Sequence, residues 1–301
     1  MKEGELEFII SEENNSRVLN FLYKTAPGRL CLKIVVNPVM SKIGGIILSS
    51  RISTVLINPF IKRNGINMSE YENKKYCSFN DFFTRKIQEG KREIDFDSNH
   101  LISPCDAKLT VYEIGEKSVF NIKGSFYRIR DLLQNDVLAD NYRGGFCLIF
   151  RLSPQDYHRY CFIDDGSKGN SGYIRGVLHT VRTVSLERYN IYKENCREYT
   201  VLNTNNFGQV IQVEVGALMI GRIKNHNTIF TFKRGQEKGW FEFGGSTIVL
   251  LLKKKSIHIN PEILIASKKG RETIVKLGEK IGEVNLQSKE PEGMKMIPLR
   301  F

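Results

Sequence analysis

Three short stretches of the chain carry side chains whose types could do chemistry together. The first is Gly244-Gly245-Ser246-Thr247, which runs directly into a strongly apolar segment. Adjacent glycines permit a strained backbone and let a hydroxyl approach the preceding carbonyl without hindrance. Ser246 could therefore attack the carbonyl carbon of Gly245. Taken alone, the same four residues are more often a tight turn that enters a strand.

Such an attack would have a defined chemical outcome. The acyl group of Gly245 would move from the nitrogen to the oxygen of Ser246, forming an ester. Abstraction of the Ser246 α-proton would expel the upstream chain, and hydrolysis of the resulting dehydroalanine would leave a pyruvoyl cap. This route needs a base and a group that orients the base.

The other two stretches supply candidates for those roles. They are Ser103-Pro104-Cys105-Asp106-Ala107 and the residues from Leu152 to Cys161, which include His158. Asp106 could orient a base, or it could only form a turn after the proline. His158 could transfer a proton near neutral pH, or it could be a partly buried histidine whose hydrogen bonds are all satisfied.

The elements that must position these residues change character along the chain. Residues 1 to about 75 have a helical spacing of apolar residues, interrupted at Pro27-Gly28, Pro38 and Asn58-Pro59. A further helix is predicted to start near Ser78 or Asn80, either of which could cap it.

From about residue 101 onward, short β-rich runs are separated by Gly, Pro, Asn and Asp. Two of them, Phe146 to Phe150 and Ile248 to Leu252, lack alternation, which is typical of strands covered on both faces. We therefore predict an α+β fold, in which N-terminal helices pack against a largely antiparallel β core. The predicted strands are Lys108 to Tyr112, Phe146 to Leu152, Tyr173 to Val184, Val210 to Glu214, Thr228 to Phe232 and Thr247 to Leu252.

The formal net charge of +12 favours a polyanionic partner, although a solvated basic surface without a partner is an alternative. The sequence has no zinc-finger spacing and no basic run longer than Lys253-Lys254-Lys255, so an anionic membrane surface is preferred to nucleic acid. Its six cysteines include no CxxC pair, which favours a reducing cytoplasmic compartment.

The most apolar stretch, Leu30 to Ser50, is interrupted by Lys33, Pro38 and Lys42 and is not expected to span a membrane. It could form amphipathic helices that lie at a membrane interface. Packing of the same residues on the protein's own core is the alternative.

The chain resembles the phosphatidylserine decarboxylase family in six motifs, which occur in the family's order between about residues 76 and 255. They are Phe79 to Arg85, Ser103 to Asp106, Lys123-Gly124 through Leu133, Ser153 to Tyr160, Glu214 through Gly221, and Lys238 to Thr247.

The resemblance implies a proenzyme that cuts itself between Gly245 and Ser246. Ser246 would become the pyruvoyl group, Asp106 would orient the base of self-cleavage, and His158 would lie beside the substrate as an acid or hydrogen-bond donor. Residues 1–245 would form a β chain and residues 246–301 an α chain, which stay together as a heterodimer. The implied domains are a helical membrane-proximal region, 1–75, and a catalytic domain, 76–301.

The implied reaction converts phosphatidylserine in the membrane to phosphatidylethanolamine and carbon dioxide. The pyruvoyl ketone condenses with the lipid's amine and accepts the electrons released by decarboxylation, so neither pyridoxal phosphate nor a metal is expected. We expect peripheral attachment at the cytoplasmic face of the cell membrane.

Three positions depart from the family pattern. The histidine of Asp-Tyr-His-Arg is normally followed three residues later by a second histidine, the base of self-cleavage, but that position is Cys161 here. A neutral thiol is a poorer base than imidazole, although a lowered pKa could generate a thiolate. Ala107 replaces the usual glycine after Asp106.

The third departure is His179, which stands where the family more often has an aromatic residue, shortly before Arg182-Thr183 in place of Asn-Pro. We hypothesise that His179 substitutes for the missing base. The alternative is that His179 is only a strand residue.

Two other functions would also explain parts of the sequence. A Ser-His-Asp hydrolase would use the same residue types, but the residues around Ser246 lack the second glycine of a GxSxG elbow. A membrane-binding relative of the decarboxylases that cannot process itself would explain Cys161.

Overall fold

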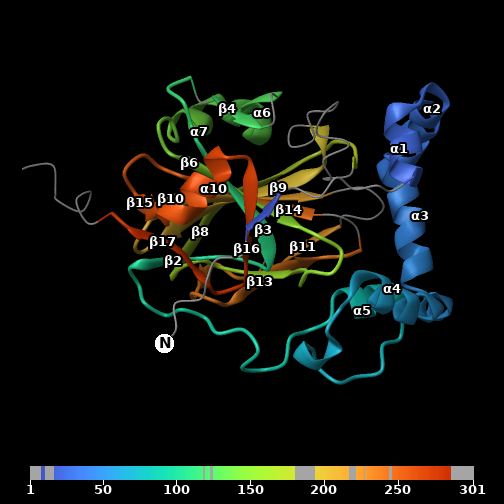
Figure 1. Ribbon diagram of the computed structural model, residues 1–301. Coiled ribbons are helices and arrows are strands. Elements are labelled where there is room, and N and C mark those ends of the chain that lie inside the picture. Colours follow the sequence, from blue (N-terminus) through green and yellow to red (C-terminus); the bar gives the residue numbers. More distant parts are fainter. Residues whose placement is uncertain are drawn as a thin grey trace, which may run out of the picture.

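The computed structural model describes residues 8–10, 17–117, 119–122, 125–179, 194–216, 222–226, 228–243 and 246–285. Within these residues, a nine-stranded sheet in which every neighbouring pair is antiparallel forms the centre of the protein (Figure 1). In spatial order its strands are β1 (Phe8–Ile10), β16 (Arg271–Val275), β3 (Ala107–Glu113), β6 (Phe146–Leu152), β14 (Ser246–Leu252), β10 (Gly208–Gly216), β9 (Arg197–Thr204), β8 (Gly166–Ile174) and β12 (Thr231–Phe232).

The central strands are buried on both faces, as their unbroken apolar runs predict. All seven residues of β14 are buried, and its side chains alternate between two core clusters. Ile248 and Leu250 belong to the first cluster, whereas Val249 and Leu251 belong to the second. Burial of each such side chain contributes about 1.5–3 kcal/mol, so β14 is anchored in the sheet.

Smaller elements cover the two faces of the sheet. Ile263 of α10 (Pro261–Lys268) lies in the first cluster, and Leu132 of α6 (Ile129–Leu133) and Ala139 of α7 (Asp136–Asp140) lie in the second. The remaining strands form three small antiparallel sheets: β11 (Ile223–Asn225), β13 (Glu237–Phe241) and β7 (Arg159–Cys161); β15 (Ile257–Ile259), β17 (Lys280–Val284) and β2 (His100–Ile102); and β4 (Val119–Ile122) with β5 (Ser125–Arg128).

The N-terminal helices form a column beside the β core, with α4 and α5 at its foot (Figure 1). They are α1 (Arg17–Lys24), α2 (Ala26–Val35), α3 (Pro38–Leu48), the 3-10 helix η1 (Arg51–Leu56), α4 (Ile57–Asn64), the 3-10 helix η2 (Met68–Glu70) and α5 (Phe79–Phe83).

Side-chain caps explain where these helices begin. The Gly28 amide donates to Thr25 Oγ1 at 3.1 Å, and the Val39 amide donates to Asn37 Oδ1 at 2.9 Å. Ser78 caps α5, as the sequence predicts, since its Oγ accepts from the Asp81 amide at 3.1 Å.

The column exposes large apolar side chains on α2, α3 and η1, and we call this set of residues the apolar helix face. The exposed residues are Leu30, Ile34, Val39, Met40, Ile43, Ile46, Ile47, Ile52, Val55 and Leu56. Ile46 is 73% exposed and Ile52 is 81% exposed, so these side chains do not pack on the protein's own core.

Among the described residues, no single helix has the length and hydropathy expected of a membrane span. Lys42–Leu48 and Arg51–Asn64 meet these criteria only when taken together, and the chain bends by 78° between them.

Two sequence predictions are corrected by the fold. Residues 8–10, inside the segment predicted to be helical, form a strand because they pair with β16 at the edge of the sheet. The strand predicted from Tyr173 to Val184 ends at Ile174, and residues 180–193 lie outside the described part of the chain. Its true beginning, at Gly166, is polar and rich in glycine, so only pairing with β9 identifies it.

Candidate active site

Four strands of the central sheet begin or end at one edge. Ser246 begins β14 and pairs with Leu152, the last residue of β6, and with Gly216, the last residue of β10. β3 begins at Ala107, directly after Asp106, and runs antiparallel to β6. Because these ladders are all antiparallel, Ser246, Asp106 and the loop after Leu152 lie at the same end of these four strands, which we call the reaction edge.

The hydroxyl of Ser246 is fully buried and makes no hydrogen bond within the described residues. A buried hydroxyl without a partner costs about 1–3 kcal/mol, and such groups often have a reactive role. The neighbouring Thr247 hydroxyl is also buried, and it too has no hydrogen-bond partner in the part of the chain that the structure describes. Gly245, the other half of the predicted cleavage site, lies outside the described residues.

The imidazole of His158 is buried and has one free nitrogen. Its Nδ1 lies 2.8 Å from the carbonyl oxygen of Asp156, which can only accept, so Nδ1 carries the proton. Nε2 is therefore a bare acceptor, and it has no hydrogen-bond partner within the described residues. Burial, with a smaller contribution from Arg85, lowers the pKa of His158 to about 3, so the ring is neutral at pH 7.

Three contacts hold the loop that carries His158 in place. The His158 carbonyl accepts from the Phe241 amide at 2.9 Å, and the His158 ring packs on Phe83 with centroids 4.1 Å apart. The buried guanidinium of Arg85 donates to the Gln155 carbonyl at 3.0 Å. These contacts tie the loop to β13 and to the helix α5.

Asp156 forms a hydrogen bond within the same loop. Its Oδ2 accepts from the Ser153 amide at 2.6 Å, and burial, as the main cause, raises its pKa to about 6. A carboxyl group with this pKa can exchange a proton near neutral pH. Asp156 is therefore a titratable group close to His158.

Helix α5 also holds the segment just before the predicted cleavage site. Phe243 packs edge-to-face on Phe79 and Phe83, with centroids 4.9 and 5.1 Å away. Its amide donates to Asn80 Oδ1 at 3.3 Å. Aromatic pairs of this kind contribute about 0.5–1.5 kcal/mol each beyond burial. The motif Phe79 to Arg85 therefore positions both the His158 loop and the approach to Ser246.

The carboxylate of Asp106 is bonded to a cation rather than to a histidine. Arg92 donates from Nε to Oδ1 at 3.1 Å and from Nη2 to Oδ2 at 2.6 Å, and the Leu277 amide donates to Oδ1 at 2.9 Å. Arg92 also reaches Glu70 Oε2 at 2.8 Å. Asp106 is 2% exposed, so this pairing keeps a buried negative charge neutralised.

Cys161 lies beside the stretch that contains Asp106, because its amide donates to the Pro104 carbonyl at 2.9 Å. Burial raises the pKa of its thiol to about 12. The thiol is therefore protonated at neutral pH and cannot act there as a base.

His179 is joined to the partner strand of Ser246 through Asn195. The His179 amide donates to Asn195 Oδ1 at 2.9 Å, while Asn195 Nδ2 donates to the carbonyls of His179 and Gly216, both at 2.8 Å. Its ring Nδ1 lies 3.2 Å from the hydroxyl of Tyr23 on α1. Burial lowers the pKa of His179 to about 4.

The structure thus gathers Asp106, His158 and Ser246 at one edge and links His179 to that edge through the backbone. Sequence reasoning did not identify the roles of Arg85, Arg92 and Asp156. Arg85 and Asp156 lie inside motifs that the chain shares with the family, so the resemblance could have indicated them. Arg92 lies in none of those motifs.

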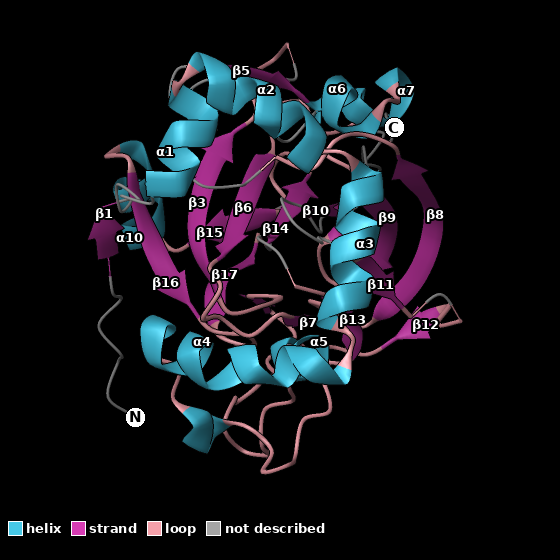
Figure 2. Ribbon diagram, turned by 90° about the vertical axis from the view of Figure 1, so that its right-hand side faces the viewer, coloured by secondary structure: helices cyan, strands magenta, loops and turns pink. Residues whose placement is uncertain are grey.

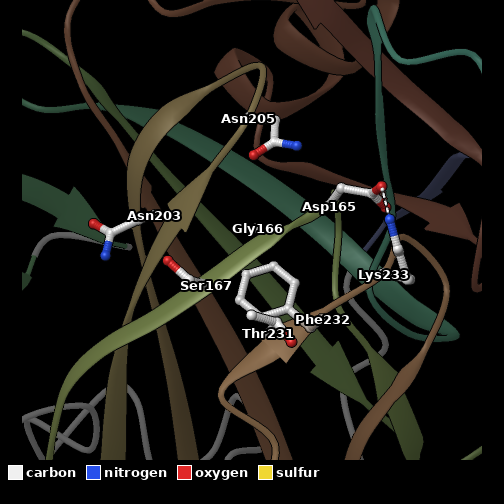
Figure 3. A pocket seen from close by; sticks show the side chains of 8 residues that line it. All are labelled: Asp165, Gly166, Ser167, Asn203, Asn205, Thr231, Phe232 and Lys233. Carbon is white, nitrogen blue, oxygen red and sulfur yellow. Dashed lines mark hydrogen bonds and ion pairs between the residues drawn. The ribbon is translucent and has the colours of Figure 1, made fainter.

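Cavities lie at several places among the described residues. One of about 730 Å³ is bounded by α2 and by His179, and one of about 130 Å³ lies next to Arg92 and Cys161. A third, of about 280 Å³, is at the opposite end of β9 from the reaction edge (Figure 3). Its cation, Lys233, is already paired with Asp165 at 2.9 Å. The described residues contain no group of three or more His, Cys, Asp or Glu side chains that could hold a metal ion.

Comparison with known proteins gives a consistent result. The family model for phosphatidylserine decarboxylase matches residues 79–283. The chain is 53% identical over 280 residues to phosphatidylserine decarboxylase proenzyme 2 of Clostridium acetobutylicum, covering 93% of this chain and 96% of the relative. It is 40% identical to the proenzyme of Clostridium botulinum (92% and 96% covered) and 38% identical to that of Clostridium tetani (94% and 95% covered).

Proposed function

Since the chain belongs to the phosphatidylserine decarboxylase family, it is a carboxy-lyase proenzyme that converts phosphatidylserine to phosphatidylethanolamine, and we propose that Ser246 becomes its pyruvoyl group. The observation that carries this proposal is the buried, unpartnered hydroxyl of Ser246 at the start of a central strand. The residues around it fit a small ketone, because Ser246 is buried and β14 holds it between β6 and β10.

The proposed self-cleavage uses side chains of this protein and one water molecule. Ser246 Oγ attacks the Gly245 carbonyl carbon as a base takes its proton. The Gly245–Ser246 C–N bond then breaks, and the freed nitrogen takes up that proton, which leaves an ester between Gly245 and Ser246 Oγ. Loss of the Ser246 α-proton to a base breaks the Cβ–Oγ bond of this ester. The upstream carboxylate leaves, and water then releases ammonia from the dehydroalanine to give the pyruvoyl group. The products are a β chain, 1–245, and an α chain, 246–301, which we propose remain together as the active heterodimer.

We propose His179 as the base of this step. The Cys161 thiol, at the position of the family's usual histidine, is protonated at neutral pH because burial raises its pKa to about 12. The His179 ring is neutral at that pH, and Asn195 fixes its backbone to Gly216, the strand partner of Ser246. Asp106 is proposed to orient the base, with Arg92 holding its carboxylate at the reaction edge.

In lipid turnover, the pyruvoyl group supplies a ketone that condenses with the substrate amine and draws electrons from the breaking bond to carbon dioxide. We propose that His158 moves the proton. Its bare Nε2 accepts a hydrogen bond from the substrate amine and takes the proton that the amine nitrogen gives up as it bonds to the ketone carbon. The imidazolium then returns a proton to the carbon that carbon dioxide has left. Because burial disfavours the charged ring, this return is favourable.

We propose that the enzyme is a peripheral protein of the cytoplasmic face of the membrane. The apolar helix face and the net charge of +12 both suit an anionic bilayer surface. All six cysteines are free thiols, the state that a reducing compartment favours.

Intact mass under denaturing conditions tests the proposal. Wild-type protein should give two chains divided after Gly245, with pyruvoyl in place of Ser246 at the start of the smaller chain. Ser246→Ala should give one uncut chain with a similar melting temperature. An uncut wild-type chain in fresh, lipid-supplemented preparations would contradict self-processing, and cleavage of Ser246→Ala would contradict the role of Ser246.

A further inference from the structure

One cavity lies between α2 and the core segment 176–179. Its volume of about 730 Å³ is in the range of small-molecule sites. The lining residues are Ala26, Arg29, Leu30, Leu32, Lys33, Val36, Gly176, Val177, His179 and Glu194. Figure 2 shows α1, α2 and α3 in front of the β core, so that the cavity belongs to the junction of the two parts.

The walls combine apolar side chains with a pair of cations. Arg29 and Lys33 are four residues apart on α2 and therefore share one face of the helix. Within the described residues, no carboxylate forms an ion pair with either of them, although other basic residues of the chain are paired. Two unpaired cations above apolar walls match a group that has a negative charge next to hydrocarbon.

The opposite wall carries one carboxylate. Glu194 lies beside His179, with Oε2 3.9 Å from the ring Nε2. The cavity therefore presents two cations on the helix side and an acidic group on the core side. Of the membrane phospholipids, one whose headgroup carries both a phosphodiester and an ammonium is complementary to this arrangement.

The position of the cavity connects a membrane surface with the reaction edge. On the helix side, Leu30 is 68% exposed and Ile34 is 61% exposed, and both belong to the apolar helix face. On the core side, Asn195 links His179 to Gly216, which pairs with Ser246. A lipid held here would keep its tails toward the apolar helix face and its headgroup toward Ser246.

We propose that this cavity is the binding site for the phosphodiester and glycerol portion of the lipid substrate. Arg29 and Lys33 bind the phosphate, Leu32, Val36 and Val177 contact the first carbons of an acyl chain, and Glu194 attracts the ammonium of the serine headgroup. The inference rests on the proposed function, because it assigns a subsite to that same substrate.

Binding can be measured without catalysis in the Ser246→Ala proenzyme. The ligand is dihexanoyl phosphatidylserine below its critical micelle concentration, so that general attraction to a membrane surface does not contribute. Arg29→Gln/Lys33→Gln should weaken binding at least tenfold. Lys62→Gln/Arg63→Gln, which removes the same two charges from exposed positions on α4, is the matched control and should bind as the parent does. Equal affinities in all three proteins would overturn the inference.

Two further ligands test whether the cavity recognises the lipid or any phosphate. Glycerophosphoserine, which lacks the tails, should bind more weakly than the dihexanoyl lipid because the apolar walls are unused. If inorganic phosphate displaced the lipid at the same concentration as glycerophosphoserine does, the cavity would be a general anion site, contrary to the proposal. Val177→Trp fills the cavity without changing charge and should also weaken lipid binding; comparable melting temperatures confirm that each variant is folded.

The decarboxylation assay separates this inference from the proposed function. If wild-type protein turns over the soluble lipid and Arg29→Gln/Lys33→Gln raises KM with little change in kcat, both stand. Turnover with an unchanged KM in the double variant would refute the subsite alone. A wild-type protein that binds the lipid through Arg29 and Lys33 but never decarboxylates it would refute the proposed function alone.

Discussion

His158 and Cys161 stand three residues apart, and burial acts on both in ways that composition does not show. It lowers the pKa of the imidazole to about 3 and raises that of the thiol to about 12. Both groups are therefore neutral at pH 7, but only the imidazole then has a basic lone pair. The same physical effect leaves the imidazole with an unprotonated nitrogen and keeps the thiol protonated.

Cys161→Ser should therefore leave self-cleavage within about twofold of the wild-type rate, because the protonated thiol takes no part. The rate is measured from the fraction of cut chain at intervals after synthesis, with Ser246→Ala as the uncut control. His179→Ala should abolish or strongly slow cleavage. An uncut but normally folded Cys161→Ser protein would mean that the thiol is the base.

His158 should also make the folded state sensitive to acid. The unfolded imidazole takes up a proton near pH 6.5, whereas the folded one does so only near pH 3. Stability from this group is complete above about pH 6.5 and falls by about 1.4 kcal/mol per pH unit as the pH drops toward 3.

The measurement compares His158→Asn, whose amide can replace the Nδ1 donor, with its parent, both in the uncleaved Ser246→Ala background. Urea unfolding at several pH values should show the variant gaining stability relative to the parent below pH 6.5. Parallel curves for the two proteins down to pH 4 would show that the imidazole is protonated in the fold.

Among the elements, β10 and β13 are joined by a fully buried ion pair. Lys238 Nζ lies 2.8 Å from Glu214 Oε1 and 2.9 Å from Asn225 Oδ1, and both charged side chains are 0% exposed. Burial raises the pKa of Glu214, against the effect of Lys238. The pair fixes β13, which leads to the cleavage segment, against β10, which pairs with β14.

Removing one partner should be costly because the other charge is then buried alone. Lys238→Met should destabilise the uncleaved protein by about 3–5 kcal/mol, whereas Glu214→Leu/Lys238→Met should recover much of that loss. Chemical unfolding of the two single variants and the double variant gives the coupling energy. A double variant as unstable as the sum of the two single variants would show that the pair does not act as a unit.

The whole molecule consists of a β core that holds the reaction edge and a helical column that carries an apolar exposed face. Apolar side chains exposed in such number on one part of a protein usually mark a surface that binds something. The substrate is a membrane lipid, and the cavity between column and core is lined by His179, which Asn195 links to Gly216, the strand partner of Ser246. Under the proposed function, the column docks on the membrane and the core carries out the reaction.

Ile46→Gln/Ile47→Gln should weaken binding to vesicles of phosphatidylserine and phosphatidylcholine by tenfold or more, since both side chains are exposed on α3. Co-sedimentation measures the effect. Val137→Gln is the matched control, because Val137 is 82% exposed but lies on α7, away from the helical column (Figure 1). An equal loss of vesicle binding in both variants would contradict a specific role of the apolar helix face in membrane binding. The electrostatic part should weaken further at high salt.

The sequence by itself determined the α+β class and the doubly buried strands β6 and β14, and it indicated candidate site residues. Unbroken apolar runs and the Gly-Gly-Ser sequence are local properties, and they depend on adjacent residues alone. Ser246, Asp106 and His158 were therefore identifiable from their types and motifs. The domain boundary near residue 75 and the roles of the site residues stay predictions.

Only the tertiary structure decided how those residues are paired and charged. Asp106 pairs with Arg92, burial raises the pKa of Cys161, His179 contacts Tyr23, and Arg29 and Lys33 border a cavity. Residues 8–10 join the sheet for the same reason that β8 begins at Gly166: strand pairing is a contact between distant segments. Burial and pairing arise from contacts far apart in sequence, and because they set pKa values and cavities, local patterns could not supply them.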